Sequence, residues 1–166
     1  MTDIREKAAE GLQVGDVFSI SRTFSTQDVI LFADISGDFN PVHFDPRFAK
    51  AKKFDACICH GLLVIGPLTE IGGQIGWLAT GMEIKFKKPV YSGDTIECVF
   101  TITELDERDN AKAEAVFTNQ IGLVVAEVIL TGKVPGVKEK QVMKTMLSEG
   151  DPTNGLFRRI RATKNF

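Results

Sequence analysis

The sequence predicts an α+β domain in which an antiparallel sheet wraps around one long buried helix. Residues 57–78, CICHGLLVIGPLTEIGGQIGWL, have the length and apolar spacing of a helix. From Gly81 onward apolar and polar residues alternate, as in strands that bury one face. A helix that is apolar nearly all round must be covered on most sides, and a curved sheet does this with few elements.

Length and composition indicate one globular domain. The 166 residues are 43% hydrophobic and 25% charged. The start, MTDIREKAAEGL, is unlike a signal peptide, and the longest apolar run, Leu62–Leu68, is far shorter than the roughly 20 residues of a membrane helix. The net charge of −2 argues against a nucleic-acid surface over the whole chain. We therefore expect a cytoplasmic protein with no nucleic-acid and no membrane partner.

The charge divides the chain into two segments. Residues 137–166 hold seven basic and three acidic residues, a net charge of +4 that leaves −6 for residues 1–136. We predict a domain over residues 1–136 and a basic C-terminal tail over 137–166. One possible short helix would place Met143, Met146 and Leu147 on one side. A solvated or loosely docked tail and an arm that contacts phosphate or a partner both fit this composition.

The first elements are a strand and a capped helix. Val17–Phe24 is β-branched and aromatic, which predicts a strand. Ser25 followed by Asp28 is the pattern of a capping box, so a helix begins there. Gly37 and Pro41 end this helix, because proline lacks the backbone donor and disfavours a helical residue before it.

Two further helices follow. Asp45 before Pro46 is the pattern of an N-cap with proline at the first helical position, which predicts a short helix. The long buried helix is expected to begin near His60 or Gly61. Pro67 lies inside it, and an internal proline costs ~3 kcal/mol, so we expect a kink there.

The second half of the domain reads as an antiparallel meander. Turn-rich segments separate four stretches of period-two alternation. The predicted strands are Met82–Val90, Thr95–Leu105, Ala111–Gln120 and Leu123–Val134.

The three cysteines indicate buried free thiols. Cys57, Cys59 and Cys98 are odd in number and lack paired metal-type spacing. A zinc site at Cys57, Cys59 and His60 is disfavoured, because no second pair of ligands exists.

The stretch SGDFNPVHFDPRFA, residues 36–49, concentrates polar chemistry that no amphipathic pattern requires. On a continuous helix Asp38 and His43 would lie about 140° apart. In a loop they can converge on one small molecule and hold a water, one group accepting its proton and the other delivering a proton elsewhere. Asn40 could orient either group. Each of the three residues also fits an ordinary turn or cap, and the residues alone leave both interpretations open.

A family resemblance adds to this interpretation. Residues 32–43, FADISGDFNPVH, with Ala49 six positions on, resemble the signature of the R-specific enoyl-CoA hydratases and MaoC-like dehydratases, which have the hotdog fold. The resemblance extends to Cys59–Leu62 and to the Phe86–Asp94 stretch, and covers about residues 12–135. Pro67 departs from the family pattern.

The resemblance implies reversible syn addition of water to a trans-2-enoyl thioester, carried on CoA or acyl carrier protein, with no metal and no further cofactor. It implies that Asp38 and His43 are the catalytic pair, without deciding which is the base. Gly61 sits where the family places the backbone N–H that binds the thioester oxygen, and Asn40 is a candidate for substrate binding. His60 is expected to have a structural or supporting role. The resemblance also implies a homodimer or a higher homo-oligomer with the active site near a subunit interface.

Other chemistries remain as alternatives. His43, Asp45 and His60 have the composition of an iron site of two histidines and one carboxylate, although Asp45 is better explained as a helix cap. Within the same fold, the protein could be a thioesterase or a module that binds acyl thioesters without converting them. A thioesterase would need a carboxylate on the central helix, where Glu70 is the only acid and is expected to be a surface charge.

The phosphates of a CoA ligand would meet lysines rather than a glycine-rich loop. The segment GPLTEIGG lacks the Gly-Lys-Ser/Thr end of a phosphate loop. Lys85, Lys87, Lys88 and the basic tail are the candidates, with a solvated strand face as the alternative interpretation of the lysines.

Overall fold

The computed structural model describes residues 4–151 and residue 153 of the chain. Its centre is a five-stranded antiparallel sheet with the strand order β1-β3-β4-β5-β2. The order confirms the predicted α+β fold with an antiparallel sheet. The meander comprises only β3, β4 and β5, because β2, the first of the four predicted meander strands, lies at the sheet edge beside β5 rather than beside β3. The strands are β1 Val17–Thr23, β2 Leu78–Phe86, β3 Thr95–Leu105, β4 Asn110–Asn119 and β5 Val124–Lys133.

Four strands lie within one residue of their predicted bounds, whereas β2 was predicted at Met82–Val90. β2 begins four residues earlier, because Gly76 ends the preceding helix in the left-handed region with φ 80° and Leu78 already pairs with β5. It ends earlier because the N–H groups of Lys87 and Lys88 both bond to one carbonyl of β5 before the chain reaches a proline.

The predicted central helix is split in two rather than kinked. α4 spans Gly61–Val64 and α5 spans Pro67–Ile75, with Pro67 at the start of α5. Proline is favoured at this position because its missing N–H needs no intrahelical partner there. α5 buries Leu68 and Ile71 against the sheet and forms the main hydrophobic core with it. We call the five-stranded sheet together with α5 the body.

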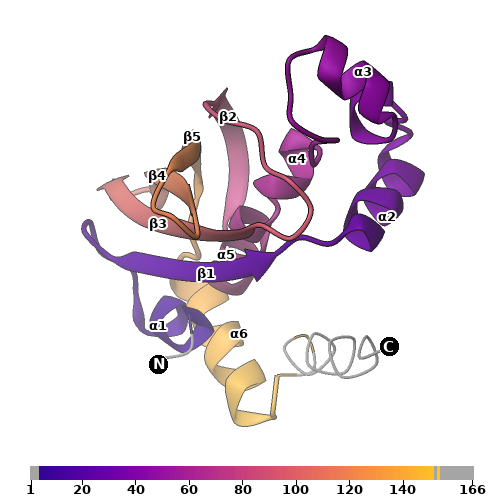
Figure 1. The fold of residues 1–166 in the computed structure, drawn as a ribbon. Helices are drawn as coiled ribbons and strands as arrows, with labels where there is room; N and C mark the ends of the chain where they lie inside the picture. The colour runs from indigo at the N-terminus through magenta and orange to yellow at the C-terminus, as the bar shows by residue number, and fades with distance from the viewer. Residues whose placement is uncertain (1–3, 152, 154–166) are drawn as a thin grey trace.

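Two helices lie outside this arrangement at one end of the body (Figure 1). α1, Ile4–Glu10, was not predicted, and α6, Val137–Ser148, is the possible helix of the predicted tail. Met143 of α6 is buried in the main core, so this part of the tail is docked rather than solvated. Arg5 of α1 donates to the carbonyl of Gly73 in α5 (2.9 Å) and forms an ion pair with Asp151 (3.4 Å). The basic end of the tail lies outside the described residues.

A group of short helices stands apart from the sheet, at the upper right of Figure 1. We call residues 26–51 the overhang. It consists of α2 Thr26–Ser36, the 3-10 helix η1 Pro41–His43 and α3 Pro46–Ala51.

Side-chain caps define the helix ends of the overhang. Both bonds of the predicted capping box between Ser25 and Asp28 are present. Gly37 ends α2 in the left-handed region with φ 73°. Asp45 caps α3 by accepting from the N–H of Arg47 at 2.9 Å. These three predictions from the sequence are confirmed.

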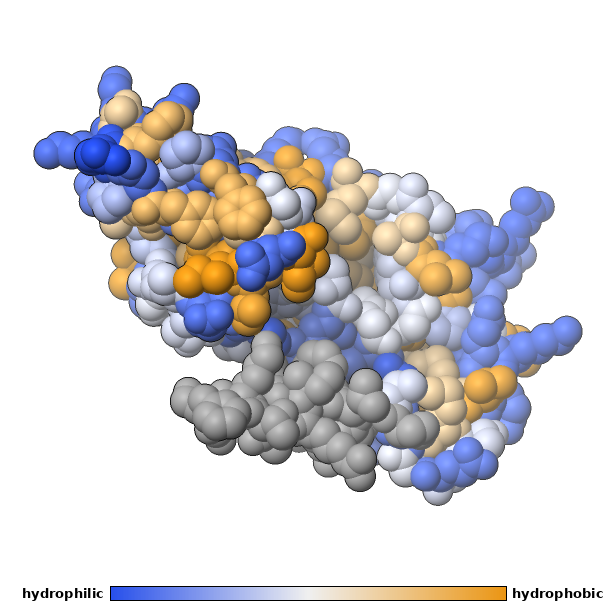
Figure 2. Space-filling model, turned by 90° about the vertical axis from the view of Figure 1, so that its right-hand side faces the viewer, coloured by the Kyte–Doolittle hydropathy of each residue, from blue (hydrophilic) through white to orange (hydrophobic). Residues whose placement is uncertain are grey.

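The overhang exposes several large apolar side chains. Figure 2 shows the face to which it contributes, where apolar surface gathers beside strongly hydrophilic side chains. The exposed set comprises Ile30, Leu31, Ile35, Phe39, Phe44 and Phe48. None of the described helices is long and apolar enough to cross a membrane.

Candidate active site

The predicted convergence of Asp38 and His43 is observed. The left-handed turn at Gly37 directs the chain out of α2, and η1 turns it back, so that Asp38 Oδ2 lies 3.8 Å from His43 Nε2. This distance is too long for a direct hydrogen bond. A water placed between the two atoms can contact both.

His43 is held in one tautomer. Its Nδ1 lies 2.8 Å from the backbone oxygen of Ile58, and because a carbonyl only accepts, Nδ1 carries the proton. In the neutral ring Nε2 therefore keeps its lone pair and faces Asp38. The His43 side chain is 8% exposed and that of Asp38 is 50% exposed. The pair thus joins a buried proton acceptor to a carboxylate at the solvent boundary.

A pocket of about 360 Å³ opens beside this pair. His43 and Gly61 both line it, together with apolar side chains that include Ile58, Val64 and Phe86. The lining suits an apolar ligand whose reactive end reaches His43.

Gly61 has a specific steric reason to be glycine. It is the first residue of α4, so its N–H lies outside the intrahelical hydrogen-bond ladder. A Cβ at this position would lie 2.6 Å from Cζ of Phe86. The ring of Phe86 therefore packs directly onto the backbone at Gly61, where the family resemblance implies the oxyanion donor. No local pattern in the sequence predicts this contact, because Phe86 is 25 residues away on another element.

Asn40 has a turn-forming role in the structure. Its Oδ1 accepts from the N–H of Val42 at 3.2 Å and caps η1, while its own N–H donates to Asp38 Oδ1 at 3.1 Å. Asn40 does not line the pocket. It contributes to the site by shaping the turn that carries Asp38.

In the iron-site alternative Asp45 is the carboxylate ligand, but its side chain is already engaged by Arg47. The side chain of Arg47 donates hydrogen bonds to both carboxylate oxygens of Asp45, and these hydrogen bonds lower the pKa of Asp45 to about 2. Asp38, His43 and His60 do offer ligand atoms within 4.8 Å of one another. However, the two imidazole rings are stacked at a centroid distance of 3.7 Å and an angle of 30°, so their in-plane lone pairs run side by side instead of meeting at one ion.

Glu70 is not the surface charge that we expected. Its side chain is only 11% exposed and pairs with the guanidinium of Arg22 on β1. An acid that faces β1 in an ion pair, and that does not line the pocket, is not placed for thioester hydrolysis. The structure therefore gives no support to the thioesterase alternative.

The buried-thiol prediction holds for two of the three cysteines. Cys59 and Cys98 are buried, whereas Cys57 is partly exposed. Burial raises the pKa of Cys98 to about 12 and that of Cys59 to about 11. Cys59 also lines the pocket, which the sequence did not indicate.

Comparison with known proteins identifies the family of the chain. The family model described as "MaoC like domain" matches residues 12–123, which include the overhang, both histidines and the strands β1 to β4. The chain belongs to the MaoC-like family. α1 and α6 of this MaoC-like protein lie outside the matched residues.

Similar proteins include curated hydratases and dehydratases. An (R)-specific enoyl-CoA hydratase of Aeromonas caviae is 33% identical over 130 residues, which cover 76% of this chain and 95% of that protein. A 3-hydroxybutyryl-CoA dehydratase of Methylorubrum extorquens is 29% identical over 158 residues, which cover 90% of this chain and 98% of that protein.

The fold is also that of solved hydratase structures. The structure of an (R)-hydratase from A. caviae superposes with a TM-score of 0.70 and 31% identity, covering 76% of this chain and 99% of that one. An unliganded R-hydratase from Pseudomonas aeruginosa has a TM-score of 0.69 and 26% identity, covering 76% of this chain and 84% of that one. The predicted hotdog fold is therefore confirmed.

Proposed function

We propose that this MaoC-like protein is a hydro-lyase that adds water reversibly to trans-2-enoyl thioesters and forms R-3-hydroxyacyl thioesters. The observation that carries the proposal is the 3.8 Å gap between Asp38 Oδ2 and His43 Nε2. This gap accommodates one water beside a pocket that His43 and Gly61 line. The names of the similar proteins support the same reaction class.

The chemistry follows from this arrangement. The oxygen of the held water attacks the β-carbon while one group of the pair accepts a proton from it. The pair then delivers this proton to the α-carbon on the same face, so the carbon–carbon double bond is replaced by one C–O and one C–H bond. Negative charge develops on the thioester oxygen, and the N–H of Gly61 is the proposed donor to it.

The lone pair on Nε2 of His43 supports this histidine as the group that accepts a proton from the water in hydration. The imidazolium so formed returns a proton to the α-carbon, while the Asp38 carboxylate accepts a hydrogen bond from the water and orients it. Water, the Asp38–His43 pair and a backbone N–H suffice for the reaction, so we propose that it uses no metal or organic cofactor. Treatment with EDTA is then expected to leave turnover unchanged, as measured by the loss of enoyl absorbance.

The experiment that tests the function is a spectrophotometric assay with crotonyl-CoA. The wild-type protein is expected to consume the enoyl absorbance, and Asp38→Asn and His43→Gln are each expected to lower kcat by about 10²- to 10⁴-fold, the usual contribution of general acid–base groups. Asp34→Asn is the matched control, because Asp34 is an exposed acid of the same overhang. Binding of crotonyl-CoA without any turnover by the wild type would instead identify a binding module.

We propose that Lys88 contacts the phosphates of the acyl carrier. Lys87 and Lys88 both line the pocket, but Lys87 is paired with Glu127 at 2.8 Å. Lys85 is likewise paired with Glu83 at 3.0 Å. Lys88→Ala is expected to raise KM for crotonyl-CoA and to leave KM for a crotonyl thioester of N-acetylcysteamine, which has no phosphate, unchanged. An equal effect on both substrates would contradict this role.

We propose a homodimer that pairs along β2. β2 is an edge strand, and its exposed apolar side chains include Leu78, Met82 and Phe86. An exposed apolar edge strand is a template for pairing with another chain. A second copy there would also cover Phe86 next to Gly61. Sedimentation is expected to give a dimer for the wild type and a monomer for Met82→Lys, and a monomeric wild type would contradict the proposal.

A further inference from the structure

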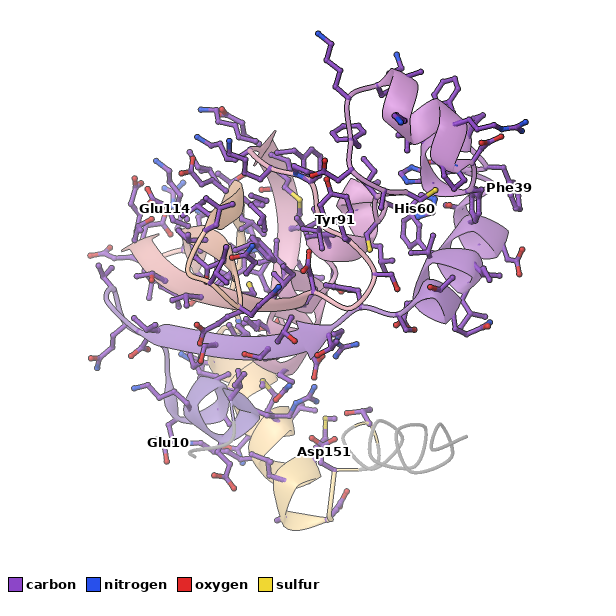
Figure 3. The ribbon with its side chains drawn as sticks, in the orientation of Figure 1. Glu10, Phe39, His60, Tyr91, Glu114 and Asp151 are labelled. Carbon is purple, nitrogen blue, oxygen red and sulfur yellow. The ribbon has the colours of Figure 1, made fainter. Side chains whose placement is uncertain are left out.

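His60 is a buried polar side chain to which the proposed reaction assigns no step. Only 2% of its surface is exposed, and Figure 3 shows it near the start of α4, where the body faces the overhang. A polar side chain is buried at a cost unless hydrogen bonds compensate. Its contacts therefore indicate what this imidazole does that an apolar ring would not.

His60 contacts both members of the Asp38–His43 pair. Its Nε2 donates to the backbone oxygen of Asp38 at 2.9 Å, directly after the left-handed turn at Gly37. The face of its ring stacks on the ring of His43 at a centroid distance of 3.7 Å. His43 is consequently held at its edge by the carbonyl of Ile58 and on its face by His60.

Two other aromatic rings complete the surroundings of His60. The ring of Phe32 in α2 lies at a centroid distance of 5.0 Å, and that of Phe44 lies at 6.1 Å. The second ring nitrogen, Nδ1, is buried and has no hydrogen-bond partner among the described residues. His60 does not line the pocket, so it is not placed to exchange a proton with the substrate.

We propose that His60 is a positioning residue that fixes the positions of Asp38 and His43 relative to the N–H of Gly61. This inference rests on the proposed function. His60 is the N-cap of α4, and Gly61 is the first residue of that helix. One residue thus links the acid–base pair of the overhang to the oxyanion donor at the start of α4. Loss of either contact would let the His43 ring or the Asp38 turn drift relative to the substrate.

Two substitutions separate the two contacts. His60→Gln keeps a donor that can reach the Asp38 carbonyl but removes the ring, and His60→Phe keeps the ring but removes the donor. The chain has only two histidines, so in either variant His43 is the only imidazole and its nitrogen NMR signals need no assignment in tag-free protein.

The expected result has a kinetic and a spectroscopic part. With crotonyl-CoA, kcat falls on the order of 10- to 100-fold in both variants while KM stays within twofold, because misplacement of reacting groups acts on the transition state. In His60→Gln, which removes the stacked ring, the ring nitrogens of His43 change from the fixed tautomer with the proton on Nδ1 to an average of two tautomers, whereas in His60→Phe they keep the wild-type signals. The value of kcat in either folded variant tests the proposal, so the test does not depend on both variants folding.

A matched control distinguishes positioning from general destabilisation. Ile102→Val removes one methylene from the core in β3 and is expected to preserve kcat and the His43 signals. Folded His60 variants with wild-type kcat, or a folded His60→Gln variant with lowered kcat and unchanged His43 signals, would overturn the inference. A wild-type protein without turnover would contradict the proposed function instead, and the NMR signals of His43 would still test the contact.

Discussion

The body and the overhang are held together by different interactions. In the body, each strand is hydrogen-bonded along its length to a neighbour, and α5 adds a continuous apolar core. In the overhang, the three elements have 11, 3 and 6 residues and depend on side-chain caps. The strands of the body contribute Phe86 and Val125 to the pocket, α4 and the connecting segments contribute most of the rest, and the overhang supplies Asp38 and His43. Substitutions in the two regions should therefore be detected by different measurements.

The largest expected effect tests whether the body can be weakened without changing the chemistry. Phe100 of β3 is buried, and its ring packs edge to face against that of Trp77 at a centroid distance of 5.6 Å. Phe100→Ala is expected to lower the free energy of unfolding by about 3–5 kcal/mol, the range for large aromatic truncations. Denaturant titration measures this loss. Turnover per folded molecule should stay near wild type, and a loss as large as that of Asp38→Asn would show that the two regions are not separable.

The second prediction concerns the place where the body meets the overhang. Gly61→Ala would press a Cβ into the ring of Phe86, which lies 2.6 Å from that position. Overpacking costs ~1–3 kcal/mol, so kcat/KM is expected to fall by about tenfold or more.

Gly73→Ala in α5 is the matched control for this substitution. No atom lies within 4 Å of a Cβ at Gly73. We expect unchanged activity and an increase in stability of about 0.5–1 kcal/mol, since alanine is favoured over glycine inside a helix. Equal losses of activity in both variants would contradict the steric explanation.

A smaller effect tests the caps of the overhang. Ser25→Ala removes the side-chain acceptor for the N–H of Asp28 and should cost about 0.5–2 kcal/mol. Amide hydrogen exchange should quicken in α2 and remain slow in β3, because only the overhang depends on this cap. Ser21→Ala, on an exposed position of β1, should change neither rate. Faster exchange throughout the sheet would show that the overhang and the body unfold as one unit.

The smallest effect concerns the pocket wall at alkaline pH. Burial raises the pKa of the Cys59 thiol from 9.0 to about 11, so the folded state favours the neutral form. The raised pKa of Cys59 leaves the free energy of unfolding unaffected below pH 9. Between pH 9 and pH 11 it lowers the free energy of unfolding, because the unfolded chain releases the thiol proton first. Denaturation at pH 8 and pH 10 should show a smaller loss for Cys59→Ala than for the wild type. Identical losses would indicate that Cys59 does not titrate in this range.

Local patterns in the sequence predicted much of the overhang correctly. The caps at Ser25 and Asp45 and the helix end at Gly37 depend on neighbouring residues, and the structure has all three. The strands β3 to β5 followed from alternation. The start of β2 was missed because Trp77–Ala79 continues an apolar run, and only pairing with β5 decides where the strand begins.

Contacts between distant residues could not be predicted in the same way. Nothing near Glu70 indicates the ion pair with Arg22, which lies 48 positions away. α1 was missed because a short polar helix has little pattern of its own, and its packing against α5 and α6 stabilises it. The position of Phe86 over Gly61 likewise depends on how β2 lies against α4.

The sequence by itself determined that Asp38 and His43 sit on a turn between two capped helices, because glycine, proline and capping side chains act on their immediate neighbours. The tertiary structure alone decided that their atoms stand 3.8 Å apart and that His60 stacks on His43. Those distances arise where the overhang packs against the start of α4. Packing of this kind depends on the shapes of side chains from several elements at once, and no local pattern encodes it.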